Sequence, residues 1–165
     1  MRKLIWPVLF LFLFILRGAG SVFYSGWLSV DLPLLGVYAH ALFRGSHYGV
    51  MSGAIVGLFE DAMIHGLFGY HIITRSILGH GIGRLKGRIF KENSFYHLPL
   101  IGAVSLALRA IYLFFAFALG MPVTSLVQYA SESFGFACGN MLFVLPIIYL
   151  CHFTYNWIKE EDRSY

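Results

Sequence analysis

The chain has 165 residues, of which 58% are hydrophobic and only 12% are charged, and its mean hydropathy is +0.72. A soluble domain carries about 25% charged residues, so this composition excludes an ordinary soluble domain. It predicts an integral membrane protein with a single transmembrane domain over residues 1–165. The net charge of +4 does not indicate a nucleic-acid partner, because the basic residues sort to one side of the membrane in the topology that the sequence predicts.

The first predicted membrane helix covers residues 4–24. Arg2 and Lys3 precede the 13 apolar residues LIWPVLFLFLFIL, a length that also fits the hydrophobic region of a signal peptide. Arg17 follows this run and is badly placed before a cleavage site. We therefore favour a retained helix with Arg17 near its outer end, and a cleaved signal peptide is the alternative.

Asp31, Leu32 and Pro33 mark the start of a second helix, because an acidic residue and an early proline are typical of a first helical turn. The helix predicted over 32–43 is short for a hydrocarbon core of about 30 Å. We expect it to be tilted or to span only part of the membrane.

The third and fourth helices, predicted over 46–65 and 70–85, carry glycine at every fourth position. The glycines concerned are Gly45, Gly49, Gly53, Gly57, Gly79 and Gly83. Glycine weakens a helix in water by about 1 kcal/mol, but in lipid it lets helix backbones approach closely. We interpret these glycines as a packing face, and the sequence leaves open whether the packing is within this chain or with a partner.

Two more helices complete a predicted six-helix bundle. They cover 97–119 and 134–158, with 123–133 as an outer loop and Pro146 as a kink. A basic loop precedes the fifth helix on the cytoplasmic side, and its cations are Arg84, Lys86, Arg88 and Lys91. This loop is a candidate contact for lipid headgroups or for a cytoplasmic filament.

The basic residues also predict the orientation of the bundle. With both termini inside, nine of the 12 Lys and Arg residues fall on inner segments, and none falls in an outer loop. The nine are Arg2, Lys3, Arg44, Arg84, Lys86, Arg88, Lys91, Lys159 and Arg163. This distribution follows the positive-inside rule and predicts an all-α, multi-pass integral membrane protein that is N-in and C-in.

Five charged residues are predicted inside apolar helices, where an unpaired charge costs at least a few kcal/mol. They are Glu60, Asp61, Arg75, Arg109 and Arg17. At a rise of about 1.5 Å per residue, counting along the helices sets them at similar depth toward the outer leaflet. We expect a buried ion cluster of Glu60, Asp61, Arg75 and Arg109, which Arg17 can join. Such a cluster either only locks helix packing, or forms a partner contact or a pocket for a small charged ligand.

No motif for catalysis or metal binding stands out. The seven histidines include no pair at i, i+3 or i, i+4 spacing, and no cysteine lies near His65 or His71, so we expect no metal site. The segment Gly79–Gly87 lacks the spacing of a phosphate-binding loop and has no strand before it. The sequence therefore predicts a protein that is not an enzyme and holds no cofactor.

Several of these features together resemble the MreD family, small membrane proteins of the bacterial rod-shape system. They are the chain length, the six-helix layout, Asp-Leu-Pro after the first helix, and the run G-x-x-x-G-L-x-x-D followed by H-G. In this sequence that run consists of Gly53, Gly57, Leu58, Asp61, His65 and Gly66. The resemblance covers residues 31–109 and is weaker at both ends.

The resemblance implies a non-enzymatic component of the cell-elongation machinery in the bacterial inner (cytoplasmic) membrane. Proteins of this family bind MreC, a bitopic protein with a periplasmic domain. Together they link the cytoplasmic MreB filament to the peptidoglycan polymerase and transpeptidase outside. Membrane lipid is the other expected partner, and nucleic acid is not expected. The fold of the family is similar to that of the substrate-binding subunits of energy-coupling-factor vitamin transporters.

That similarity supplies the alternative function, a substrate-binding subunit of such a transporter. These subunits dock their partner through an Ala-x-x-x-Ala motif in the first helix, whereas the first helix here carries the bulky run FLFLFIL. They also bind vitamins from the outer side, where the ion cluster is expected. A pocket for a small molecule on that side is therefore an alternative under either family resemblance.

Overall fold

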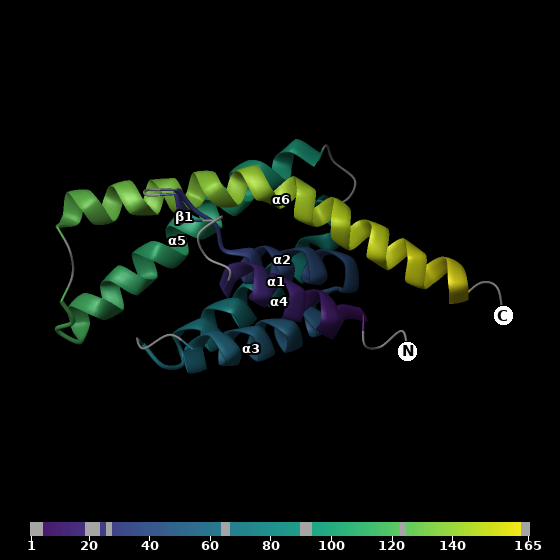
Figure 1. Cartoon of the computed structure of the whole chain (residues 1–165), viewed down its shortest axis with the longest axis horizontal. Helices are drawn as coiled ribbons and strands as arrows, with labels where there is room; N and C mark the ends of the chain where they lie inside the picture. Colours follow the sequence, from purple (N-terminus) through teal and green to yellow (C-terminus); the bar gives the residue numbers. More distant parts are fainter. Residues whose placement is uncertain are drawn as a thin grey trace.

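The computed structural model describes residues 5–18, 24–25, 28–63, 67–89, 94–122 and 125–162. This part of the chain is almost entirely helical (Figure 1). Its six α-helices are α1 (Ile5–Gly18), α2 (Leu32–Arg44), α3 (Ser46–Met63), α4 (Tyr70–Ile89), α5 (His97–Ala118) and α6 (Leu126–Asp162). A 3-10 helix, Ser94–Tyr96, precedes α5. The short strands β1 (Tyr24–Ser25) and β2 (Leu28–Ser29) form an antiparallel pair.

The helix α2 forms the core of the molecule. Every residue from Leu32 to Phe43 is buried, and α1, α3, α4 and α6 all contact this helix. Asp31 starts the helix by accepting the N–H of Leu34 at 3.0 Å, and Gly45 ends it with a φ of +92°, a conformation that favours glycine. The helix predicted over 32–43 is therefore present to within one residue, and it is the most buried element of the fold.

Glycines bring α3 and α4 into backbone contact. A Cβ atom built on Gly53 would lie 2.6 Å from the carbonyl carbon of Arg75, so any side chain there would push the two helices apart. The glycines that meet backbone of the other helix, or of the turn before α3, are Gly49, Gly53, Gly57, Gly79 and Gly83. These five positions pack within this chain. Gly45 has a different role: its built Cβ has no atom within 4 Å and its positive φ ends α2, although its carbonyl carbon lies against Gly83 of α4.

The two ends of the predicted bundle differ from expectation. The helix α1 covers Ile5–Gly18, residues 19–23 of the predicted helix lie outside the described residues, and Tyr24 lies in the strand β1 rather than in a helix. The helix α6 begins at Leu126 rather than residue 134, so most of the expected outer loop is helical. The polar residues of this segment are typical of a loop. In the structure, however, the hydroxyl of Ser125 accepts the N–H of Gln128 at 3.3 Å and so caps the start of α6. Figure 1 shows α6 bent along its length, and Pro146 lies inside it.

The predicted cytoplasmic basic loop is largely helical. Arg84, Lys86 and Arg88 all lie in α4, which extends to Ile89 rather than ending at residue 85. Lys91 lies outside the described residues. The Nζ of Lys86 donates to the carbonyl oxygen of Phe43 at 2.5 Å, so this side chain caps the last turn of α2 instead of extending into solvent.

Two helices, α5 and the part of α6 from Leu126 to Tyr155, are long and apolar enough to cross a membrane. Large apolar side chains are exposed on several helices, including Leu11 on α1, Ile55 on α3 and Phe114 on α5. Glu60 and Arg75, in contrast, are buried. This arrangement, apolar outside and charged inside, is the reverse of that in a water-soluble protein and indicates association with lipid.

Candidate functional site

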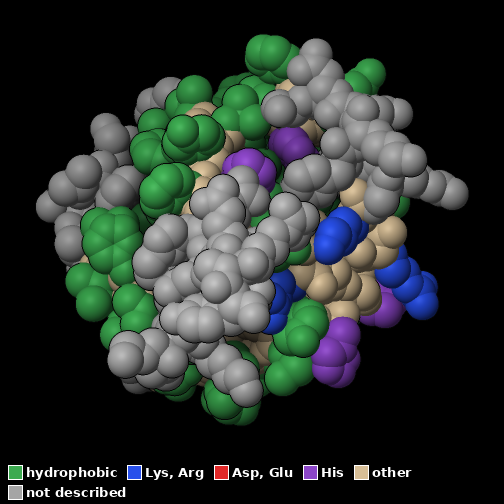
Figure 2. Space-filling view, turned by 90° about the vertical axis from the view of Figure 1, so that its right-hand side faces the viewer, with side chains coloured by type: hydrophobic (Ala, Val, Ile, Leu, Met, Phe, Trp, Pro, Cys, Tyr) green, Lys and Arg blue, Asp and Glu red, His purple; other side chains and the backbone are tan. Residues whose placement is uncertain are grey.

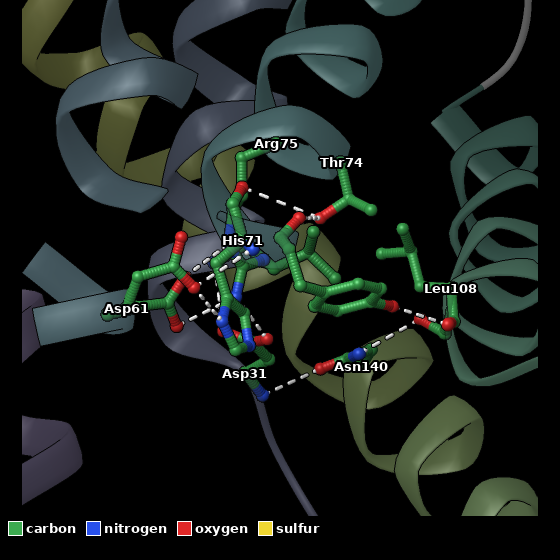
Figure 3. A network of polar contacts seen from close by, with 11 residues as sticks. Asp31, Asp61, His71, Thr74, Arg75, Leu108 and Asn140 are labelled. Atoms are coloured by element: carbon green, nitrogen blue, oxygen red, sulfur yellow. Dashed lines mark hydrogen bonds and ion pairs between the residues drawn. The ribbon is translucent and has the colours of Figure 1, made fainter. Parts of the chain in front are cut away.

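Arg75 on α4 holds the main polar network of the described residues together (Figure 3). Its side chain is almost fully buried, with only 2% of the residue exposed. The guanidinium binds both oxygens of Glu60 on α3, Nε to Oε2 and Nη2 to Oε1, the second at 2.7 Å. Nη2 also donates to Oδ2 of Asp31 at 2.6 Å. One cation therefore joins α3 and α4 to the start of α2, and such charge-assisted, two-pronged pairs are the strongest hydrogen bonds in proteins.

Asp31 extends this network to α5 and α6. Besides binding Arg75 and capping α2, it donates its backbone N–H to Oδ1 of Asn140 on α6 at 2.8 Å. The Nδ2 of Asn140 in turn donates to Oγ of Ser105 on α5 at 2.9 Å. Asn140 and Ser105 have no exposed surface, so these bonds have no competition from solvent. The network as a whole links five of the six helices.

Asp61 belongs to a different group, at the start of α4. Its carboxylate accepts the backbone N–H groups of Gly69, His71 and Ile72 at 3.0–3.1 Å. Its Oδ1 also lies 2.8 Å from Nδ1 of His71 (Figure 3). A carboxylate at this place satisfies N–H groups that have no acceptor within the helix, and it complements the positive end of the helix dipole. Asp61 therefore caps α4 from the neighbouring helix α3.

Arg109 on α5 forms a third group, with α6. Its Nε donates to Oγ of Ser133 at 3.1 Å, and its Nη2 lies 3.5 Å from a carboxylate oxygen of Glu132. The guanidinium also stacks over the ring of Tyr129, with 4.3 Å between Cζ and the ring centroid. All three partners lie in the first turns of α6, the segment that the sequence predicted to be an outer loop.

The single ion cluster predicted from the sequence is therefore wrong in part. The structure brings Glu60 and Arg75 together but places Asp61 and Arg109 in separate groups. Counting residues along a helix estimates depth, but it does not fix the direction in which a side chain points. The fifth predicted member, Arg17, has a side chain outside the described part of the chain.

Three residues of the network escaped sequence reasoning as site residues. Asp31 was interpreted only as a helix start, although a carboxylate beside a buried helix can also bind a cation. Asn140 carries a signal in the sequence, because an amide within the apolar run of α6 requires a buried partner. Ser105 carries none, since a serine in an apolar helix often bonds only to its own backbone.

The chemistry of this site is that of a structural link. Arg75 has its hydrogen bonds directed to carboxylates, and the carboxylates of Asp31 and Asp61 also bind backbone N–H groups. Within the described ranges, no group of three or more His, Cys, Asp or Glu side chains is arranged to hold a metal ion. No protein-family model, curated protein or solved structure matches this chain.

Proposed function

We propose that this chain is a non-enzymatic, multi-pass protein of the bacterial inner membrane that acts as a scaffold in the cell-elongation machinery, in the manner of MreD. It would bind MreC and so help to couple the MreB filament to peptidoglycan synthesis outside. The proposal rests on the resemblance of residues 31–109 to that family, together with the roles that the resembling residues have in the fold.

The main support for the proposal is the role that residues of the G-x-x-x-G-L-x-x-D run have in the fold. Gly53 and Gly57 set α3 against the backbone of α4, and Asp61 caps the first turn of α4. These three residues of the run therefore build a rigid two-helix unit, and none of them is arranged to hold a reacting group. A run used for packing and capping suits a scaffold better than an enzyme.

The proposed topology has six membrane-spanning helices with both termini in the cytoplasm. It is supported by the position of the described basic residues. Lys86, near the end of α4, reaches the end of α2, next to Arg44. Figure 2 shows Lys, Arg and His side chains on this end of the molecule and no Asp or Glu side chain among the described residues in view. Lys and Arg side chains gathered at one end of a membrane protein are typical of its cytoplasmic side.

A substrate-binding subunit of a vitamin transporter is the weaker proposal. Its support from the residues was the expected position of the ion cluster toward the outer side. Arg75 and Glu60 instead bind each other, and they are 2% and 1% exposed, so neither side chain presents a free surface for a vitamin.

Co-purification tests the proposed function. The tagged full-length chain would be expressed in bacterial membranes with MreC and, separately, with the membrane scaffold subunit of a vitamin transporter. Recovery of a stoichiometric complex with MreC in mild detergent, together with rescue of rod shape in cells that lack their own MreD, is the expected result. Recovery only with the transporter subunit, or no rescue by a chain that is present at normal level in the membrane, would refute it.

A further inference from the structure

Two buried polar atoms at the α1–α2 contact have no hydrogen-bond partner among the described residues. They are Nε1 of Trp6 and Nδ1 of His40. Both residues are more than nine-tenths buried, with 8% and 7% exposed, and their ring centroids lie 4.3 Å apart. A buried polar group without a partner costs about 1–3 kcal/mol, so two at one place indicate that a polar group from another molecule binds there.

These two atoms lie next to an exposed cation. The ring of His40 meets the ring of Tyr48 edge-on, at a centroid distance of 6.4 Å. Arg44 follows His40 by one helical turn, and its Cζ lies 4.6 Å from the centroid of the same Tyr48 ring. Arg44 and Tyr48 are both exposed. The Tyr48 ring therefore contacts both the guanidinium at the surface and the buried imidazole.

The start of α3 adds backbone donors to this place. The first helical bond runs from the N–H of Gly49 to the carbonyl oxygen of Gly45, so the N–H groups of His47 and Tyr48 have no acceptor within the helix. The positive end of the helix dipole lies here as well, and such helix starts bind phosphate groups. Arg44, the free N–H groups and the Trp6 N–H are all donors, which suits an anion with several oxygen atoms.

We propose that this place binds the phosphate of an anionic phospholipid from the cytoplasmic leaflet. Arg44 and the N–H groups of His47 and Tyr48 bind the phosphate oxygens. Trp6 and His40 bind polar oxygen atoms of the headgroup or the glycerol backbone. The name "headgroup site" is used for these five residues.

The surroundings favour a lipid over a soluble phosphate. Trp and Tyr are the residues that lie at the boundary between hydrocarbon and water. On the same two helices as Trp6 and Tyr48, Val8 on α1 and Met51 on α3 are 60% and 50% exposed, so both helices present apolar side chains to acyl chains. A free phosphate ion would use the cation and the N–H groups but would leave this surface uncovered.

Lipid titration of the full-length protein in mild detergent, followed by native mass spectrometry, tests the headgroup site. Phosphatidylglycerol is the probe, and phosphatidylcholine is the zwitterionic control. We expect Arg44→Gln to weaken phosphatidylglycerol binding at least tenfold, because it removes a charge-assisted bond. Arg84→Gln is the matched control, since Arg84 is an exposed arginine of α4, and a diffuse surface charge is worth about fivefold. Equal losses in the two variants, or no preference for phosphatidylglycerol, would overturn the proposal.

His40→Phe separates binding from folding. In an empty site this change removes a buried nitrogen without a partner, so it would raise the melting temperature and leave lipid binding unchanged, which would contradict the proposal. In an occupied site it weakens phosphatidylglycerol binding several-fold while the protein stays folded. Competition with inorganic phosphate distinguishes the source of the anion. Displacement of the lipid by millimolar phosphate would overturn the assignment to a lipid, and retention of the lipid supports it.

Discussion

The contact between α3 and α4 makes a quantitative prediction for Gly53. A Cβ atom at this position would lie 2.6 Å from the carbonyl carbon of Arg75 and 2.8 Å from the backbone nitrogen of Ser76, whereas ordinary contacts are 3.4–4 Å. Because the obstructing atoms belong to backbone, they cannot rotate away. The variant Gly53→Ala therefore requires α3 and α4 to separate by about 1 Å, as the difference between these distances shows.

Two opposing effects decide the net stability of Gly53→Ala. Overpacking of a close contact costs about 1–3 kcal/mol, and the higher helix propensity of alanine returns about 1 kcal/mol or less. The strain outweighs the gain in helix propensity, so we expect the melting temperature to fall by about 3–6 °C. Separating the helices would also weaken the bonds between Arg75 on α4 and Glu60 on α3.

Gly81→Ala is the matched control for this measurement. Gly81 lies on the same helix hairpin, but a Cβ there has no atom within 4 Å. Alanine at this position gains helix propensity without strain, so the melting temperature stays equal or rises. Thermal unfolding of both variants in one detergent, followed by size-exclusion chromatography of the heated samples, gives the comparison. If Gly53→Ala is as stable as Gly81→Ala, the backbone contact between α3 and α4 is wrong.

Five further variants test the polar groups, each by the same thermal assay. Arg75→Met should destabilise the protein by about 3–5 kcal/mol, because it leaves buried carboxylates without their cation, whereas Arg109→Met should cost no more than about 1 kcal/mol because that ion pair is partly exposed. Asp61→Ala should cost about 0.5–2 kcal/mol as the loss of a helix cap, and Asp61→Asn clearly less, since asparagine also caps helices; equal losses would mean that the charge matters more than the cap. Asn140→Leu should cost about 1–3 kcal/mol because two buried partners, one of them the hydroxyl of Ser105, lose their bonds; an unchanged melting temperature would contradict the bond network.

Periodicity and turn signals in the sequence predicted the helices of the fold well. The Asp-Leu-Pro sequence predicted the start of α2, and the glycine spacing predicted a packing face, which the structure places between α3 and α4; the sequence had left open whether that face meets this chain or a partner. Both signals are local, because capping and close packing depend on residue types at fixed offsets along one helix. The start of α6 was wrong because polarity was taken as a sign of a loop, although polar side chains of a helix can face a cation on a neighbouring helix.

The candidate site could be predicted only in part because its bonds join residues that are distant in the sequence. Glu60 and Arg75 were expected in one cluster, and they do meet across the 15 residues that separate them, but Asp61, which the turn near residue 68 was expected to set opposite Arg75, instead binds the start of α4. The bond from Asp31 to Asn140 spans 109 residues, and no local pattern gives the rotation of α2 relative to α6. For the same reason, Arg109 was expected in the cluster of Glu60, Asp61 and Arg75, whereas it contacts Ser133 and Glu132 on α6.

The short length of α2 explains why the polar residues gather where they do. A helix of 13 residues is about 20 Å long, and its first turn is buried inside the protein together with Val30 and Asp31 before it. Backbone groups in such a place need partners, because lipid supplies none. The carboxylate of Asp31 accepts the N–H of Leu34 in the first turn of α2. The side-chain oxygen of Asn140 on α6 accepts the N–H of Asp31. Gly139 leaves space for the backbone of Ser29, which a Cβ at that position would obstruct. The buried ions complete this arrangement, since Arg75 neutralises the carboxylate that the helix start requires. The network is therefore a consequence of starting a helix in the interior, and the Arg75 and Asn140 variants should lower stability by loosening the start of α2.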